Sequence, residues 1–78
     1  MNKLDELIKQ HEKALERTKV FLQETIEEFK ECLKVDYTLS DREVALFADV
    51  IRFRELVEDE EYIINELKEL KEELDNDN

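Results

Sequence analysis

The sequence has no glycine, no proline and no tryptophan, and only one cysteine and one histidine among its 78 residues. Glycine and proline interrupt helices more strongly than any other residues, so their absence favours long, continuous helices. The single cysteine, Cys32, excludes a disulfide bond within the chain. With His11 as the only histidine, no cluster of cysteine and histidine residues suggests a zinc site.

Long apolar runs are also missing. The longest, from Val44 to Ala48, has five residues, whereas a membrane-spanning helix needs about 20. The N-terminal residues lack the apolar core of a signal peptide. The hydrophobic content of 41% is nevertheless too high, and too regularly spaced, for a disordered acidic segment. We therefore expect a folded cytoplasmic protein that has a reduced thiol and no contact with a membrane.

Basic residues are scarce in the second half of the chain. The formal net charge is −11, to which residues 1–37 contribute −2 and residues 38–78 contribute −9. Because affinity for nucleic-acid phosphates comes from lysine and arginine, we expect no direct binding to nucleic acid. The acidic surface is compatible with a basic protein partner, although such a surface more commonly just keeps a protein in solution.

One short segment interrupts the helical pattern. The residues from Leu39 to Val44 contain an S-x-x-E capping box, in which Ser40 and Glu43 each satisfy a backbone N–H at the start of a helix. Leu39 and Val44 lie where a hydrophobic staple would close over the box. The segment therefore predicts that the chain divides into two helices of similar length.

The first predicted helix spans about residues 3–34, with Asn2 as its N-cap. Its apolar residues form one broad stripe at helical spacing: Leu4, Leu7, Ile8, Ala14, Leu15, Phe21, Leu22, Ile26, Phe29, Cys32 and Leu33. Several heptad positions that would face a coiled-coil partner are polar, namely His11, Thr18 and Thr25. This pattern favours a helix of a bundle over the narrow seam of a two-stranded coiled coil.

The second predicted helix spans about residues 41–74, after a connection over 35–39, and a tail over 75–78 should fray. Its principal stripe should pack on the first helix: Leu46, Val50, Phe53, Leu56, Val57, Ile63, Ile64, Leu67, Leu70 and Leu74. Glu60 interrupts this stripe, and a hairpin would place it near residues 15–19. We interpret Glu60 either as a boundary carboxylate that reaches solvent or a lysine, or as a polar residue that fixes the alignment of the helices.

A second apolar face occupies the first half of this helix. Val44, Phe47, Ala48 and Ile51 cluster roughly opposite the principal stripe, and Tyr62 lies on the same side. A helix that is apolar on two sides must be covered on two sides, and a lone two-helix hairpin covers only one. We therefore predict these five residues as a partner interface, for a second copy of the chain or for a foreign target.

Matched helix lengths and a short connection predict an all-α fold. We expect one domain over residues 1–78, an antiparallel two-helix hairpin that dimerises into a four-helix bundle. The alternative is one continuous helix in a long parallel coiled coil. In that arrangement Asp36 and Glu43 would occupy consecutive core positions, where unpaired carboxylates are costly.

No catalytic or metal-binding motif is complete. Residues 27–31 match the E-E-x-x-E half of the magnesium site in all-α nucleotide pyrophosphohydrolases, but the E-x-x-D half on a later helix is absent. A di-iron bundle needs E-x-x-H motifs, and Ile8 stands where His11 would need a glutamate. Cys32 lies about 31 Å from His11 along one helix, too far for a catalytic pair. We expect no cofactor, no metal site and no enzymatic activity.

The remaining hypotheses concern protein contacts. The first is a small, acidic, non-enzymatic helical protein that acts through self-association and protein–protein interaction, as an assembly or adaptor protein. The alternative is a small acidic antagonist that docks on a basic protein, for example one that binds nucleic acid, and blocks its ligand. A homodimer that hides Phe47 favours the first hypothesis, and a monomer that exposes Phe47 favours the second.

Overall fold

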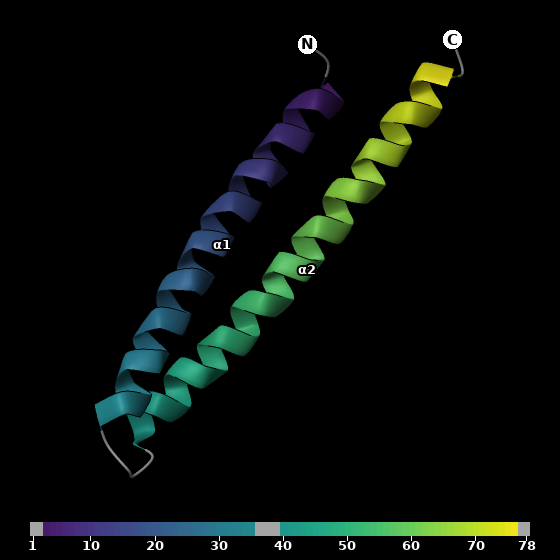
Figure 1. Ribbon diagram of the computed structural model, residues 1–78. Helices are drawn as coiled ribbons and strands as arrows, with labels where there is room; N and C mark the ends of the chain where they lie inside the picture. Colours follow the sequence, from purple (N-terminus) through teal and green to yellow (C-terminus); the bar gives the residue numbers. More distant parts are fainter. Residues whose placement is uncertain (1–2, 36–39, 77–78) are drawn as a thin grey trace.

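The computed structural model describes residues 3–35 and 40–76, which form two long antiparallel helices (Figure 1). Helix α1 runs from Lys3 to Val35 and helix α2 from Asp41 to Asn76. The start of α1 and the end of α2 lie together at one end of the hairpin, the open end, and the opposite end is the loop end. The hairpin measures 63 × 16 × 14 Å. The predicted all-α hairpin is confirmed, and the single continuous helix is excluded because the chain reverses its direction.

The Ser40 half of the predicted capping box forms at the start of α2. The backbone N–H of Glu43 donates a hydrogen bond to Ser40 Oγ at 3.3 Å, and the N–H of Val44 donates to the Ser40 carbonyl oxygen at 3.1 Å. Asp41 and Glu43 lie in the first turn, where the helix dipole favours negative charge. Leu39, the other member of the predicted staple, lies outside the described residues.

The helix ends differ slightly from the expected ones. α1 includes Val35, which we had placed in the connection, and α2 continues to Asn76, two residues beyond the expected end. Asp75 and Asn76 are therefore helical rather than frayed. The predicted N-cap Asn2, the remainder of the connection at 36–39 and the last two residues lie outside the described part of the chain.

The helices meet along a single seam. Its most enclosed apolar side chains are Ile8, Val50 and Ile64, with exposed fractions of 7%, 4% and 5%. Val50 and Ile64 are two heptads apart, and Glu43, also buried, lies one heptad before Val50. The same position of the α2 heptad therefore faces α1 along its length. No large side chain among the described residues is completely buried, because each helix covers only one side of the other.

The principal stripe of α2 is wider than α1 can cover. Leu46, Phe53 and Val57 are partly buried in the seam as predicted. Four other members of the stripe remain more than one third exposed: Leu56, Ile63, Leu70 and Leu74. Our prediction that α1 covers these four was wrong. Leu56, Ile63 and Leu70 lie on the flank of the seam, whereas Leu74 shares the heptad position of Phe53 and lies near the end of α2, at the open end of the hairpin.

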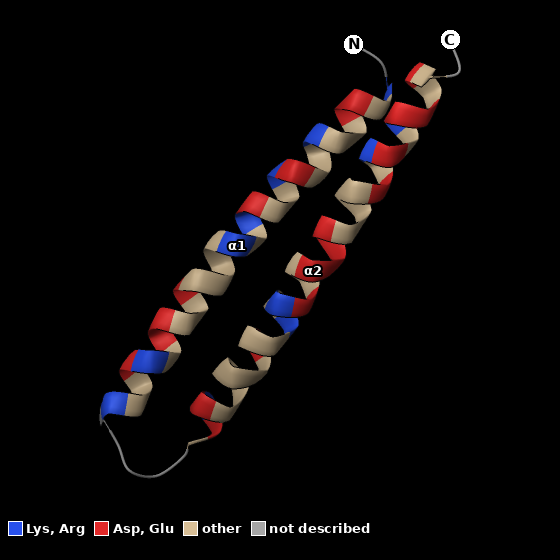
Figure 2. Cartoon of the chain, turned by 45° about the vertical axis from the view of Figure 1, so that its right-hand side comes forward, with Lys and Arg blue, Asp and Glu red and all other residues tan. Residues whose placement is uncertain are grey.

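Acidic side chains dominate the open-end half of α2, whereas acidic and basic side chains are mixed along α1 (Figure 2). Folding back places the mixed first half of α1 beside the acidic second half of α2, which permits ion pairs between the helices. Over the residues that the structure describes, neither helix offers an apolar stretch of the kind that crosses a membrane.

Candidate protein-interaction surfaces

The seam divides the surface of the hairpin into two sides, which are identified by ion pairs that bridge the helices. On one side, Arg42 Nη2 lies 2.6 Å from Glu28 Oε1, and this hydrogen bond raises the pKa of Arg42 above its ordinary value. On the other side, Lys68 Nζ lies 3.7 Å from Glu12 Oε2. Residues seven apart in helices that pack along such a seam return to the same side. Each side can therefore be followed along both helices in steps of one heptad.

The first side carries an apolar strip that we call the broad face. Its members are Leu7 and Phe21 from α1 and Leu56, Ile63 and Leu70 from α2, which are 37–54% exposed. At the open end, Leu7 and Leu70 line one shallow groove of about 400 Å³, so the two helices contribute to one continuous surface. The ring of Phe21 also stacks on Phe53, with 6.3 Å between the ring centroids.

The broad face was not among the interface residues predicted from the sequence. We assigned the α2 members to the principal stripe and the α1 members to the broad stripe of the first helix, as though the hairpin buried them all. The width of these stripes was the available signal, because an apolar third position in each heptad is typical of helices that have more than one neighbour in a bundle.

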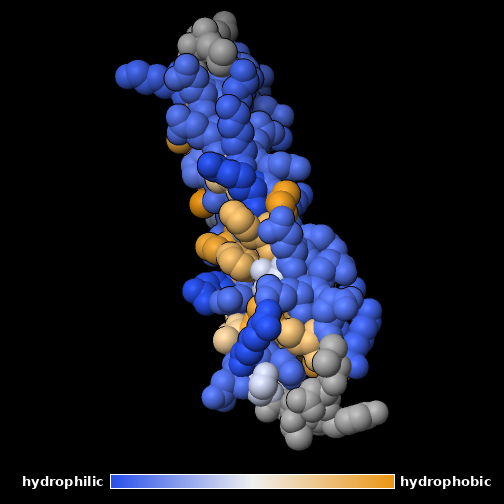
Figure 3. All heavy atoms as spheres, turned by 90° about the vertical axis from the view of Figure 1, so that its left-hand side faces the viewer, coloured by the Kyte–Doolittle hydropathy of each residue, from blue (hydrophilic) through white to orange (hydrophobic). Residues whose placement is uncertain are grey.

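The second side carries a smaller apolar cluster near the loop, the loop-end patch. Its members are Leu33, Val44, Phe47 and Ile51, which are 43–52% exposed. Leu33 lies three heptads after Glu12 on α1, and Phe47 lies three heptads before Lys68 on α2. Because Glu12 and Lys68 face each other across the seam, Leu33 and Phe47 also lie near each other, closer to the loop. Figure 3 shows a view in which apolar side chains gather between the middle of the molecule and the loop end, while the open end is hydrophilic.

We had predicted that Phe47 lies opposite the seam, and this prediction was wrong. Its ring centroid is 5.7 Å from that of Phe29 in α1. Phe47 lies four residues after Glu43 and three before Val50, both of which are buried against α1, and such spacings return to one face of a helix. Phe47 therefore borders the seam, with half of its surface covered and 51% exposed.

The other predicted interface residues are divided by the structure. Ala48 is exposed and borders the patch, since it lies one turn from both Val44 and Ile51. Tyr62 is 66% exposed, but it lies about 16 Å beyond Ile51 along the helix. The structure thus gathers four of the five predicted residues, adds Leu33 to them, and leaves Tyr62 apart.

A polar layer interrupts the seam in the open-end half of the hairpin. Glu60 Oε1 is hydrogen-bonded to Nδ1 of His11, and both side chains are partly buried. Glu60 had been expected near residues 15–19, so its actual neighbour in α1 lies about one turn closer to the N-terminus. The partner of this carboxylate is therefore a histidine rather than a lysine, and 21% of the Glu60 side chain remains exposed.

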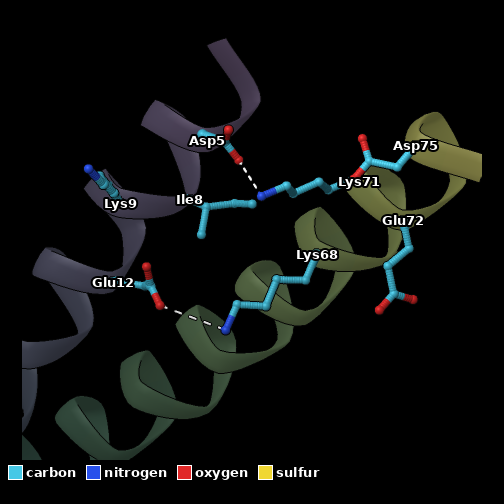
Figure 4. A pocket seen from close by; sticks show the side chains of 8 residues that line it. All are labelled: Asp5, Ile8, Lys9, Glu12, Lys68, Lys71, Glu72 and Asp75. Atoms are coloured by element: carbon cyan, nitrogen blue, oxygen red, sulfur yellow. Dashed lines mark ion pairs between the residues drawn. The ribbon is translucent and has the colours of Figure 1, made fainter. Parts of the chain in front are cut away.

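The open end of the second side is charged rather than apolar (Figure 4). Lys71 Nζ lies 2.7 Å from Asp5 Oδ1, and the Lys68–Glu12 pair lies one turn nearer the loop. The hydrogen bond to Asp5 raises the pKa of the Lys71 ammonium above its ordinary value. These ion pairs lie beside the buried Ile8, which is the one hydrophobic residue among the charged residues that line the surface here.

The glutamates at 27, 28 and 31 contact different partners. Glu27 accepts a hydrogen bond from Gln23 at 2.9 Å, Glu28 pairs with Arg42, and Glu31 pairs with a lysine of its own helix. Within residues 3–35 and 40–76 there is no group of three or more histidine, cysteine or acidic side chains placed to hold a metal ion. Cys32 is partly buried and unbonded to any other cysteine.

No protein-family model matches the chain, and no curated protein or solved structure has significant similarity to it. The two apolar surfaces and the charges around them are therefore the features from which a function can be argued.

Proposed function

We propose that this chain is a non-enzymatic helical protein that acts through self-association and by binding another protein, as an assembly or adaptor protein does. The observation that supports the proposal is the amount of apolar surface that the hairpin leaves open. Single exposed hydrophobic side chains are normal, but contiguous patches mark interaction sites. Here nine of the twelve exposed large hydrophobic residues in the described part of the chain gather into two clusters on opposite sides of the seam, the broad face and the loop-end patch.

Two clusters allow two separate contacts. Among the residues that the structure describes, only three apolar ones are almost completely buried, which is a small core. Covering the exposed half of one leucine, isoleucine or phenylalanine is worth about 1 kcal/mol. Association through either cluster would therefore add stabilisation that the isolated hairpin lacks.

The self-association part of this proposal is tested by sedimentation equilibrium over a range of protein concentrations. We expect a dimer at micromolar concentration, with twice the chain mass of 9.4 kDa. A folded protein that remains at the monomer mass at every concentration would contradict self-association.

The partner-binding part is tested by affinity capture from the native cell with three baits in parallel: wild type, Phe47→Glu and Tyr62→Glu. The first variant places a charge in the loop-end patch, where it would lack a partner on binding, and should lose captured proteins at least tenfold. Tyr62→Glu changes an exposed aromatic residue of the same helix outside the patch and should retain them. Equal capture by all three baits would show that the patch does not bind the captured proteins.

The acidic surface of α2 supports a second candidate function, that of an antagonist which docks on a basic protein and blocks its ligand. The acids crowd the open-end half of α2 (Figure 2), and such a field steers basic partners and weakens with salt. Binding of a monomeric chain to a basic protein, with an affinity that falls steeply as salt is added, would favour the antagonist. Salt-insensitive binding lost in Phe47→Glu would favour the adaptor.

A further inference from the structure

The broad face lies between two rows of exposed residues, one on each helix, which we call its rims. They occupy the heptad position next to the broad face on the outer side of each helix. The α1 rim carries Lys3, Arg17 and Glu24 from the open end towards the loop, and the α2 rim carries Glu73, Asp59 and Arg52 in the same direction. One rim therefore changes from basic to acidic along the hairpin, and the other changes from acidic to basic.

The two rims are level with each other along the hairpin. Lys3 and Glu73 each lie two residues outside the Asp5–Lys71 ion pair. Glu24 and Arg52 lie between the Phe21–Phe53 and Phe29–Phe47 ring contacts. Arg17 and Asp59 fall midway, so each level has one residue of either sign.

We propose that a second copy of the chain covers the broad face, related to the first by a twofold axis parallel to the helices, so that α1 of each copy lies on α2 of the other. This inference rests on the proposed self-association and names its surface and alignment. Rotation about that axis keeps both open ends at the same end of the bundle. The α1 rim of each copy then meets the α2 rim of the other copy, level by level. As a result, Lys3, Arg17 and Glu24 each meet a residue of opposite charge.

No level of these rims sets two like charges together. The rims have two further levels. At one of them the α1 residue, Gln10, is uncharged, and at the other the α2 residue, Ala45, is uncharged. Within the described residues, Lys3, Arg17 and Asp59 form no ion pair in the hairpin itself. Their charges are therefore available for contacts between copies.

The same alignment matches the interior of the broad face. Leu7 of one copy meets Leu70 of the other, and Phe21 meets Leu56, because these residues also share a level. Towards the loop the face becomes charged, but its acids are already neutralised within each chain. Glu28 is paired with Arg42, and Asp49 with Arg52, the same arginine that meets Glu24 of the second copy on the rim.

The opposite alignment, with the second copy turned end for end, is less favourable on both grounds. It would set Lys3 opposite Glu31 and Glu66 opposite Arg52, but it would place Arg17 on Arg17 and Asp59 on Asp59, and like charges opposite each other are unfavourable. It would also set the apolar open end of each face against the charged loop end of the other.

The size of the face is sufficient for a stable dimer. A side of 63 by 16 Å offers about 1,000 Å², and stable interfaces bury about 800 Å² per partner. The resulting four-helix bundle buries the third apolar position of the heptad, which the hairpin alone leaves exposed. The loop-end patch lies on the other side of the seam and remains free for a different protein.

Charge reversal tests the alignment. Arg17→Glu and Asp59→Arg each replace two attractive rim contacts per dimer by two repulsive ones, and each should weaken dimerisation about tenfold. The double variant restores opposite charges at that level and should dimerise about as tightly as wild type. In the end-for-end alignment each residue faces its own copy, so neither single variant would change the affinity, and that result would overturn the proposal.

A matched pair of isoleucines tests the surface. Ile63 on the broad face and Ile51 in the loop-end patch lie on the same helix with similar exposure, 37% and 43%. Ile63→Lys should abolish the dimer and Ile51→Lys should leave it intact, while circular dichroism of the concentrated proteins shows that both remain helical. The converse result would refute the broad face as the dimer surface yet leave self-association standing. A wild-type chain that stays monomeric would refute both.

Discussion

The polar layer formed by His11 and Glu60 offers a sharp test of what holds the two helices together. Both residues lie within the seam, with side chains that are 30% and 21% exposed. Replacing one member leaves the other without its partner in a partly dry environment, whereas replacing both converts the layer to apolar packing. The variants to compare are His11→Leu, Glu60→Leu and the double variant.

The expected magnitudes follow from the burial of these side chains. A hydrogen bond to a charged group contributes about 1.5–3 kcal/mol, and a leucine that is about three quarters buried contributes about 1–2 kcal/mol. His11→Leu loses the first and gains the second, so it should be less stable than wild type by about 1 kcal/mol. The double variant gains two such leucines for one lost bond and should be more stable by about 1 kcal/mol.

Urea titration followed by circular dichroism measures these changes, at one fixed chain concentration because association shifts the apparent stability. In thermal unfolding, 1 kcal/mol corresponds to about 4–8 °C for a domain of this size. A double variant less stable than His11→Leu would show that the polar layer stabilises the hairpin by itself and would refute this reasoning. Because a single polar layer can fix the alignment of helices, we also expect the double variant to form additional oligomeric species in sedimentation velocity.

Three further changes test the local interactions of the hairpin. Ser40→Ala removes the side-chain acceptor at the start of α2 and should lower the free energy of unfolding in urea by about 1 kcal/mol; no change would mean that α2 does not depend on this cap. Phe53→Glu places a charge in the seam beside Phe21 and should abolish helical circular dichroism, whereas a folded variant would mean that this ring is dispensable. Because the pKa of Lys71 is raised above its ordinary value of 10.5, its pairing with Asp5 stabilises the fold below that pH, and this stabilisation disappears as pH rises through the raised pKa. The stability difference between wild type and Lys71→Gln should therefore vanish at high pH, and a difference that persists there would show that the ammonium charge is not its source.

The two helices and the boundary between them follow from the sequence by itself. The absence of glycine and proline, the apolar spacing and the capping box at Ser40 indicate two long helices, because each of these features acts within a few residues along the chain. The matched lengths then indicate a hairpin. Residues such as Val50 and Ile64, at the centre of the α2 stripe, could be assigned to the seam without a structure.

The edges of the stripes could not be assigned in this way. Ile63 and Leu70 have the same apolar character and spacing as the buried residues, yet they remain exposed, since one helix covers only part of a wide stripe. Phe47 was placed on the wrong side for the same reason, because helical spacing gives an angle and not the position of the neighbouring helix.

The alignment of the two helices was decided only by tertiary packing. His11 and Glu60 are 49 residues apart in the sequence, and no local rule relates them. Their pairing depends on how far each helix slides along the other, and a shift of one turn moves every contact along the seam by about 5.4 Å. The observed alignment brings residues of opposite charge on the two rims to the same levels along the broad face. The order of charges along each helix is fixed by the local sequence, whereas the level at which the two helices meet is set by the packing of the whole seam.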